Sequence, residues 1–377
     1  MTISEQGVDA LAYAEPIGLT EQEANDLETA EVQAAQVIYS GQDFDVVGLI
    51  RRLKNEDILI PSFGHEDTRI DAAGFQRGFV WNRPQMDKFI ESILLGYPIP
   101  GIFLVKQPDK RYLVLDGQQR LTTLRRFKDG IHETREFSLR NVANEFMGLT
   151  YKTLPDDLRR QFENTFIQAI IVISDGSKES MNSVYNIFER LNSGGTQLTP
   201  HEIRVALYAG PFIDYIEGLN RYRSWRSLYG ARSSRLRDQE LVLRAIALFM
   251  NSDNYKRPLK KFLNDFVADN RDAIDPGLDQ IRLLFQAATD KIFESAGRES
   301  IRLRGSQVTA ALAEVIIAAL MDRLSTNLTN PSPESIVDAI QRLKNDSDLT
   351  VAFTRSTADE EQLTKRLTAA REAFARV

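Results

Sequence analysis

The residues in this sequence best suited to chemistry are Asp116, Gly117 and Arg120, which lie within five consecutive positions. They follow the apolar run 112–115 and precede a pattern typical of a helix. A helix that begins at such a junction leaves backbone N–H groups at its N-terminus, where an anion can bind. Gly117 permits close backbone approach, Arg120 offers a planar guanidinium to phosphate oxygens, and Asp116 can hold a metal ion or a water. The spacing therefore predicts a phosphate-binding turn.

An ordinary turn would explain the same residues. In that interpretation Asp116 caps the helix and Arg120 is a solvated side chain. The sequence contains neither a Gly-Lys-Ser/Thr triplet nor a Gly-x-Gly-x-x-Gly fingerprint. A nucleotide site at this turn would therefore differ from both a P-loop and a dinucleotide-binding loop.

Hydrophobic periodicity and turn residues predict the elements that position this turn. In the first half of the chain we expect helices over 46–54, 84–95, 118–128 and 177–191, strands over 57–61 and 166–173, and a hairpin that pairs 102–106 with 112–115. Irregular loops are expected over 62–74 and 192–197, the helix over 118–128 is expected to end at Gly130, and Thr199 with Glu202 three positions on predicts a helix start. From about residue 211 strand signals nearly vanish, and helices are expected over 238–250, 260–268, 277–294, 307–324, 333–344 and 357–376. The fold class is therefore α+β, with a mixed α/β domain over 41–208 and an α-helical domain over 209–377.

The net charge of -6 is unevenly distributed. Residues 1–40 contain eight acidic residues and no Lys or Arg, so the rest of the chain is near +2, since -6 equals -8 plus 2. Two interpretations of this arm stay open: a solvated, partly disordered tail, or a shield over a basic surface. Without Cys, without a signal-like N-terminus and without an apolar run long enough to span a membrane, the sequence predicts a cytoplasmic protein.

The stretch 221–237 contains six Arg and no acidic residue, interleaved with Tyr222, Trp225 and Tyr229. Guanidinium groups bind backbone phosphates and aromatic rings stack on exposed bases. We therefore consider a nucleic-acid surface formed by Arg221, Arg223, Trp225, Arg226, Arg232 and Arg235. The alternative is a basic helix whose Arg residues pair with acidic groups of the bundle while the aromatic side chains are buried.

Three motifs resemble a known family. Asp116-Gly-Gln-Gln-Arg followed by Leu-Thr-Thr-Leu, the stretch 75–81 (Phe-Gln-Arg-Gly-Phe-Val-Trp) and the stretch 188–199 (Phe-Glu-Arg-Leu-Asn-Ser-Gly-Gly-Thr-Gln-Leu-Thr) are similar, in this order, to the N-terminal domain of GmrSD-type, modification-dependent restriction proteins. The resemblance covers about residues 45–208. It implies a ParB/sulfiredoxin-like fold that holds nucleotide, and nucleoside triphosphate hydrolysis coupled to recognition of foreign or modified DNA.

The resemblance also implies roles for individual residues. Asp116 would position Mg²⁺ or the attacking water, Arg120 would bind phosphate, and Gly117 with the N–H groups of Gln118 and Gln119 would surround it. Arg77 would present a second cation to the phosphates, and Gln76 would orient water or base. Asn192, Gly194 and Gly195 would form a polar nest for phosphate or ribose, although helix caps would explain these three residues equally.

Many relatives carry a second domain of the HNH nuclease type, which needs a catalytic His and several ligands in a short segment. Here the only His residues are His65, His132 and His201, and Cys is absent. We therefore expect no HNH site, and a separate nuclease or effector chain as partner. The overall expectation is a nucleoside triphosphatase that acts as sensor or regulator in prokaryotic DNA defence. The alternatives are a nucleotide- or DNA-binding module without turnover, and a domain that nicks DNA with a metal at Asp116.

Overall fold

The computed structural model of this protein describes residues 37–60, 81–132, 134–191, 198–273, 277–326, 330–355 and 357–377. They divide into two compact units whose boundary falls between Leu198 and Thr199. The first unit is a mixed α/β domain and the second is helical, which confirms the predicted fold class. The limits 1–40, 41–208 and 209–377 stay predictions, and residues 1–36 lie outside the described part of the chain.

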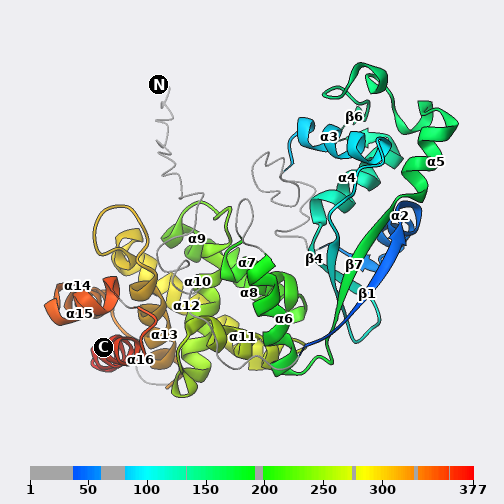
Figure 1. Ribbon diagram of the computed structural model, residues 1–377. Coiled ribbons are helices and arrows are strands. Elements are labelled where there is room, and N and C mark those ends of the chain that lie inside the picture. The colour runs from blue at the N-terminus through cyan, green and yellow to red at the C-terminus, as the bar shows by residue number, and fades with distance from the viewer. Residues whose placement is uncertain are drawn as a thin grey trace, which may run out of the picture. The chain divides into compact units, whose positions relative to one another are not determined.

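A five-stranded sheet forms the centre of the first unit. Its order is β1, β7, β3, β4, β2, with bounds Ile38–Asp45, Phe166–Ile173, Ile102–Lys106, Tyr112–Asp116 and Ile58–Leu59. β1 and β7 are antiparallel, as are β3 and β4, whereas β3 is parallel to β7 and β2 is parallel to β4. Figure 1 shows β1 and β7 as two long neighbouring arrows. The predicted hairpin and the predicted strand over 166–173 are confirmed.

Both faces of the sheet bury apolar side chains, because alternate residues of a strand point to opposite faces. Leu104, Val114 and Ile171 belong to the main core of the unit, together with residues of four helices. Those helices are α2 (Val46–Lys54), α3 (Arg83–Leu94), α4 (Gln118–Asp129) and α5 (Asp156–Asn164). Leu113 and Leu115, which alternate with Val114, are also buried, and α6 (Lys178–Leu191) contacts their strand β4.

Helix α4, which begins at the predicted phosphate turn, is fixed at its other end by an aromatic cluster. Phe127 meets the rings of Phe137 and Phe162 edge-on, with 5.4 Å between centroids in each pair. Edge-to-face pairs of this kind add about 0.5–1.5 kcal/mol each beyond burial alone. The helix ends at Gly130, whose φ is +74°, as predicted. The turn at the start of α4 is therefore connected to a rigid, deeply packed element.

Strand β1 was not expected from the sequence. Its residues, Ile-Tyr-Ser-Gly-Gln-Asp-Phe-Asp, contain a Ser-Gly pair and two Asp, and most of them are exposed. The strand forms because each residue from Ile38 to Asp45 pairs with β7, from Ile173 back to Phe166. Short strands in the second small sheet, β5 (Ile131–His132) and β6 (Arg135–Glu136), were likewise not expected.

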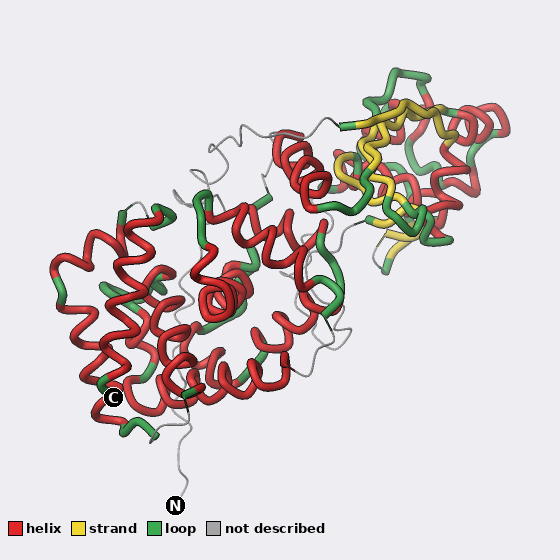
Figure 2. The backbone as a smooth tube through the Cα atoms, turned by 90° about the horizontal axis from the view of Figure 1, so that it is seen from below, coloured by secondary structure: helices red, strands yellow, loops and turns green. Residues whose placement is uncertain are grey.

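The second unit contains only helices and loops among its described residues, as Figure 2 shows. Its α-helices are α7 (Pro200–Leu207), α8 (Pro211–Asn220), α9 (Arg223–Tyr229), α10 (Arg237–Asn251), α11 (Leu259–Asn270), α12 (Gly277–Ala296), α13 (Ala310–Ser325), α14 (Pro333–Asn345), α15 (Ser347–Thr354) and α16 (Glu360–Ala375). Four short 3-10 helices (144–146, 151–153, 252–254 and 298–301) complete the described helical segments of both units. In the described part of the chain no helix is long and apolar enough to cross a membrane.

The second unit buries several polar and charged side chains. His201 on α7 is completely buried, with Nε2 at 3.0 Å from Gln239 Oε1 and Nδ1 at 3.1 Å from Arg204 Nη1. Burial lowers the pKa of His201 to about 4, although the charge of Glu240 opposes this shift. Burial by itself would raise the pKa of Glu240, but Arg244 and other neighbouring charges lower it to about 2.

These shifts predict a pH-dependent stability of the helical unit. Between pH 6.5 and 4 the unfolded chain binds a proton at His201 that the folded chain does not, so the free energy of unfolding falls as pH falls. From pH 7 to 5 the expected loss from this group is about 2 kcal/mol. Urea unfolding of a Trp81→Phe background, followed by Trp225 fluorescence, measures the helical unit alone because the chain has two Trp. His201→Gln should make the free energy of unfolding less dependent on pH. If the pH dependence stays the same in this variant, His201 is not its cause.

Candidate functional site

The predicted phosphate turn lies at the junction of β4 and α4. Asp116 is the last residue of β4 and is opposite Phe103, at an irregularity in the pairing with β3. Gly117 has φ +99° and is the N-cap residue of α4, and as a glycine it has no side chain that could cap the first turn. The positive end of the helix dipole therefore lies at the turn, where it favours a negatively charged ligand.

Gly117 has two reasons to be glycine. Its φ of +99° is in the left-handed region, which other residues adopt only with strain. A Cβ at this position would also lie 3.0 Å from Ile102 Cβ, still closer to Ile102 Cγ2, and 3.4 Å from Arg120 Nη2. The side chain of Ile102 on β3 thus packs directly against the turn. The sequence did not predict this contact of Ile102 with the turn. The only related signal was the predicted hairpin of β3 with β4.

Asp116 and Arg120 form an ion pair across the turn. Arg120 Nη2 donates to Asp116 Oδ2 at 2.6 Å, and the two side chains are 14% and 46% exposed. The Nε of Arg120 is buried and has no hydrogen-bond partner among the described residues. A guanidinium donor without an acceptor is costly in a buried position, and an incoming phosphate oxygen would satisfy it. The structure thus places Asp116, Gly117 and Arg120 together at this turn and adds the ion pair, while their binding roles stay predictions.

Gln119, the second residue of α4, connects the turn to the start of α3. Its Oε1 accepts a hydrogen bond from the backbone N–H of Trp81 at 3.1 Å. The ring of Trp81 meets Phe89 edge-on with 5.4 Å between centroids, which agrees with a packing role for this Trp. Gln118 precedes Gln119 in the first turn of α4. The predicted contacts Gln76 and Arg77 lie outside the described residues.

The predicted polar nest lies in a part of the chain that the structure does not describe. Asn192, Gly194 and Gly195 lie outside the described residues. The structure resumes at Leu198, and Thr199 caps α7 with Glu202 in a capping box, as predicted: Thr199 Oγ1 accepts from the N–H of Glu202 at 3.1 Å, and Glu202 Oε2 accepts from the N–H of Thr199 at 2.6 Å.

The residues at the turn are compatible with a nucleotide-bound Mg²⁺ rather than with an all-protein metal site. Among the described residues no group of three or more His, Cys, Asp or Glu could hold a metal. Mg²⁺ in nucleotide sites is commonly held by one or two carboxylates, by phosphate oxygens and by water. The half-exposed carboxylate of Asp116, beside a donor for phosphate, supplies one such ligand.

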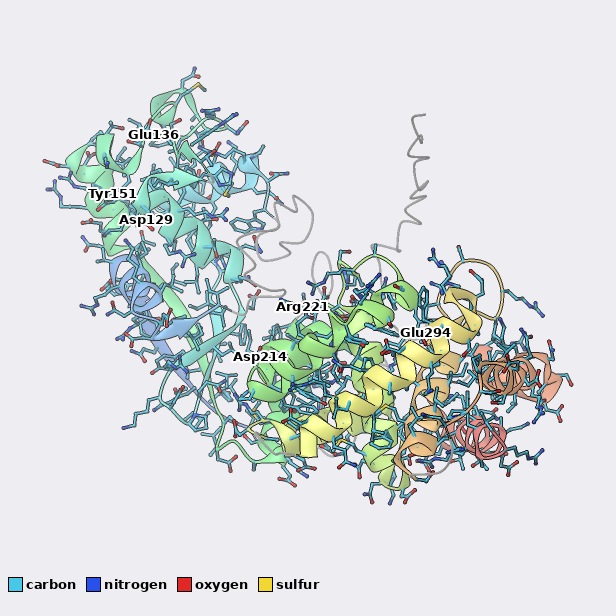
Figure 3. The ribbon with its side chains drawn as sticks, turned by 180° about the vertical axis from the view of Figure 1, so that it is seen from behind. Asp129, Glu136, Tyr151, Asp214, Arg221 and Glu294 are labelled. Carbon is cyan, nitrogen blue, oxygen red and sulfur yellow. The ribbon has the colours of Figure 1, made fainter. Side chains whose placement is uncertain are left out.

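The arginine-rich stretch belongs to the helical unit, and several of its side chains pair with carboxylates. Figure 3 shows Arg221, which lies at the C-terminal end of α8. The ion pairs are Arg221 with Glu217 at 2.9 Å, Arg226 with Asp238 at 2.6 Å, Arg232 with Glu217 at 2.5 Å and Arg235 with Glu202 at 3.3 Å. All three carboxylates are buried. These arginines therefore neutralise interior charge, as in the alternative interpretation of this stretch.

Trp225 is also placed for packing. It is completely buried, and its indole N–H donates to Asn220 Oδ1 at 2.9 Å. Base stacking needs an exposed ring face, which Trp225 does not offer in this conformation. Arg223 is the exposed member of the predicted set for which no ion pair is seen among the described residues. A nucleic-acid contact by Arg223 remains open as a proposal.

The pairing of Arg235 with Glu202 predicts a large stability effect at this stretch. Both side chains are 1% exposed, so Arg235→Ala would leave a buried carboxylate without its cation. We expect the free energy of unfolding of the helical unit to fall by about 3–5 kcal/mol. Arg223→Ala is the matched control and should change it by no more than about 0.5 kcal/mol. Urea titration with Trp225 fluorescence measures both, and equal small effects would show that the buried pair contributes little.

Comparison with known proteins finds a matching family for part of the chain. No curated protein and no solved structure matches it. One family matches, and the matched segment contains the turn at Asp116 and ends before the arginine-rich stretch. It spans 157 of 377 residues, since 209 minus 53 plus 1 is 157. Residues 53–209 match the GmrSD restriction endonuclease, N-terminal domain, which confirms for this segment the resemblance that the three motifs carry.

Proposed function

We propose that the protein is a nucleoside-triphosphate-hydrolysing sensor or regulator subunit of a prokaryotic, restriction-like DNA defence system that acts against phage. The observation that carries the proposal is the Asp116–Gly117–Arg120 turn. It combines a helix N-terminus that begins at a glycine, no room for a side chain on that glycine, and a buried guanidinium donor, all within the segment that matches a restriction endonuclease domain. Each of these features favours a bound phosphate.

Several residues of this chain would take part in phosphoryl transfer, each with a different role. Arg120 binds a phosphate oxygen and stabilises the charge that spreads over the phosphoryl group in the transition state. Gly117 and the backbone of Gln118 and Gln119 surround the phosphate at the helix N-terminus. Asp116 holds Mg²⁺ or orients the attacking water. Mg²⁺, when bound, would neutralise charge on the phosphate oxygens.

Residues outside the described part complete the proposed site. Arg77 supplies a second cation and Gln76 orients water or base. Asn192, Gly194 and Gly195 contact phosphate or ribose. The support from the structure is that Trp81, four residues after Arg77 in the sequence, contacts Gln119 at the start of α4.

The proposed partners are a nucleoside triphosphate, DNA and a separate nuclease or effector chain. The helical unit would receive the DNA or partner signal, with Arg223 as the candidate phosphate contact. The absence of Cys supports the cytoplasm as the place of action.

Phosphate release tests this function. The native protein, Asp116→Ala and Arg120→Ala are incubated with ATP, GTP, CTP or UTP and Mg²⁺, with and without DNA. Release by the native protein that both variants lose, while each keeps its native circular dichroism spectrum, supports hydrolysis at the turn and identifies the nucleotide. Release that both variants retain would place the chemistry elsewhere.

A nucleotide- or DNA-binding module without turnover is the second candidate. The observation in its favour is that Arg120 already holds one oxygen of Asp116, which leaves only the other oxygen of this carboxylate for water or metal. Nucleotide binding without phosphate release would select this candidate. DNA affinity that falls steeply as salt rises would add DNA backbone binding to it.

A further inference from the structure

The Asp116–Arg120 ion pair bears on which form of the nucleotide the turn accepts. The two opposite charges are 2.6 Å apart and span the turn from the end of β4 to the first turn of α4. Arg120 is the more buried partner, with 14% of its side chain exposed, whereas Asp116 is 46% exposed. The group proposed to bind phosphate is therefore held by the group proposed to bind metal.

Each ligand by itself meets an unfavourable charge at this pair. A metal-free phosphate that approaches Arg120 is repelled by Asp116, whose carboxylate already accepts a hydrogen bond from Arg120 Nη2. A metal ion that approaches Asp116 is likewise repelled by Arg120. In a partly buried site such interactions are screened less than in water, so both repulsions weaken the binding of a single ligand.

A metal–phosphate complex removes both penalties at once. Phosphate replaces Asp116 as the acceptor for Arg120, and the metal replaces Arg120 as the cation beside Asp116. The buried Nε of Arg120, which has no acceptor among the described residues, can gain one in the same step. One ion pair is exchanged for two, so the ion pair opposes either ligand alone and favours the two together.

We propose that the Asp116–Arg120 ion pair makes this site selective for the metal complex of a nucleoside triphosphate over the metal-free nucleotide. The inference rests on the proposed nucleotide site. It adds a coupling between metal binding and nucleotide binding that arises from the side chains of Asp116 and Arg120. Such coupling between two ligands is reciprocal, so nucleotide must strengthen metal binding by the same factor.

Equilibrium binding of radiolabelled ATP, GTP, CTP and UTP, each in EDTA and in Mg²⁺, tests the coupling without reference to hydrolysis. The native protein should bind at least one of them more tightly in Mg²⁺. Asp116→Asn removes the repelling charge and weakens the contact with Arg120, so it should bind that nucleotide in EDTA at least about fivefold more tightly than the native protein does. Its own ratio of affinities in Mg²⁺ and EDTA should fall toward one. Asp116→Ser is a second variant with the same expected result.

Asp109→Asn is the matched control. Asp109 lies in the same hairpin and pairs with Arg111 at 2.7 Å, so this substitution removes an equal charge from an exposed ion pair. It should leave both affinities unchanged. If both Asp116 variants bind metal-free nucleotide no more tightly than the native protein, the coupling is overturned while the nucleotide site stands. If no protein binds any nucleotide in either condition, the proposed function itself fails, and the coupling with it.

Discussion

Arg120→Ala is expected to lower kcat/KM for nucleoside triphosphate hydrolysis about 10²- to 10³-fold, the loss typical of removing one donor to a transition-state oxyanion. The reason for this large effect is the position of the Arg120 side chain. Arg120 is mostly buried beside the helix N-terminus, and its Nε has no other acceptor among the described residues. Steady-state phosphate release with Mg²⁺ over a range of nucleotide concentrations measures the effect.

Stability should change little in the same variant. The partner of Arg120 is the half-exposed Asp116, so loss of this ion pair costs about 1 kcal/mol or less. Arg111→Ala, which breaks an exposed ion pair in the neighbouring hairpin, is the matched control and should keep full activity. A loss of activity in Arg120→Ala that is no larger than in Arg111→Ala would show that Arg120 does not act on the phosphate.

Gly117→Ala is expected to lower the free energy of unfolding of the first unit by about 2–4 kcal/mol. About 1–2 kcal/mol comes from a left-handed backbone at φ +99° that alanine adopts with strain. The remainder comes from the new Cβ, which would overlap Ile102 and force the well-packed start of β3 to shift. The same shift would displace Arg120, whose Nη2 lies 3.4 Å from the Cβ position, so nucleotide binding should weaken as well.

Gly130→Ala separates the two contributions to this loss. Gly130 ends the same helix with φ +74°, but nothing lies within 4 Å of its Cβ position. It should therefore show only the backbone cost of about 1–2 kcal/mol. Hydrogen exchange of β3 and α4 in increasing urea measures both variants in the full chain. Equal losses in the two variants would mean that Ile102 moves aside at no cost.

Local sequence signals were sufficient where an element is stabilised by its own pattern. The helix over Val46–Lys54 and the strand over Phe166–Ile173 have the bounds that periodicity predicts. The glycine at the start of α4 and the capping box at Thr199 were likewise recognised from short motifs. In each case the physical cause lies within a few residues of the chain.

Long-range pairing could not be predicted in the same way. β1 is a strand only because the distant β7 offers a complete hydrogen-bonding edge to residues that are polar and exposed. For the arginine-rich stretch the sequence left pairing with acidic groups of the bundle as an alternative. It did not identify Glu202, Glu217 and Asp238, because the packing of α7, α8 and α10 brings those carboxylates to the stretch. The sequence showed the excess of Arg but not its partners.

The predicted site likewise combines features that follow from the sequence with features that depend on the folded structure. The closeness of Asp116, Gly117 and Arg120 follows from adjacency in the chain. The contact of Asp116 with Arg120 and the packing of Ile102 against Gly117 depend on side-chain conformation and on the pairing of β3 with β4. Both features need the folded hairpin.

The Nε–H resonance of Arg120 gives the most direct test of phosphate binding at this turn. In protein labelled with ¹⁵N-arginine the resonance is assigned by its loss in Arg120→Lys. Addition of Mg²⁺ with a non-hydrolysable ATP or GTP analogue should move it downfield, because its buried proton gains a phosphate acceptor. If the analogue saturates the protein and shifts other arginine resonances while that of Arg120 stays in place, nucleotide binds elsewhere and the turn is not the phosphate site.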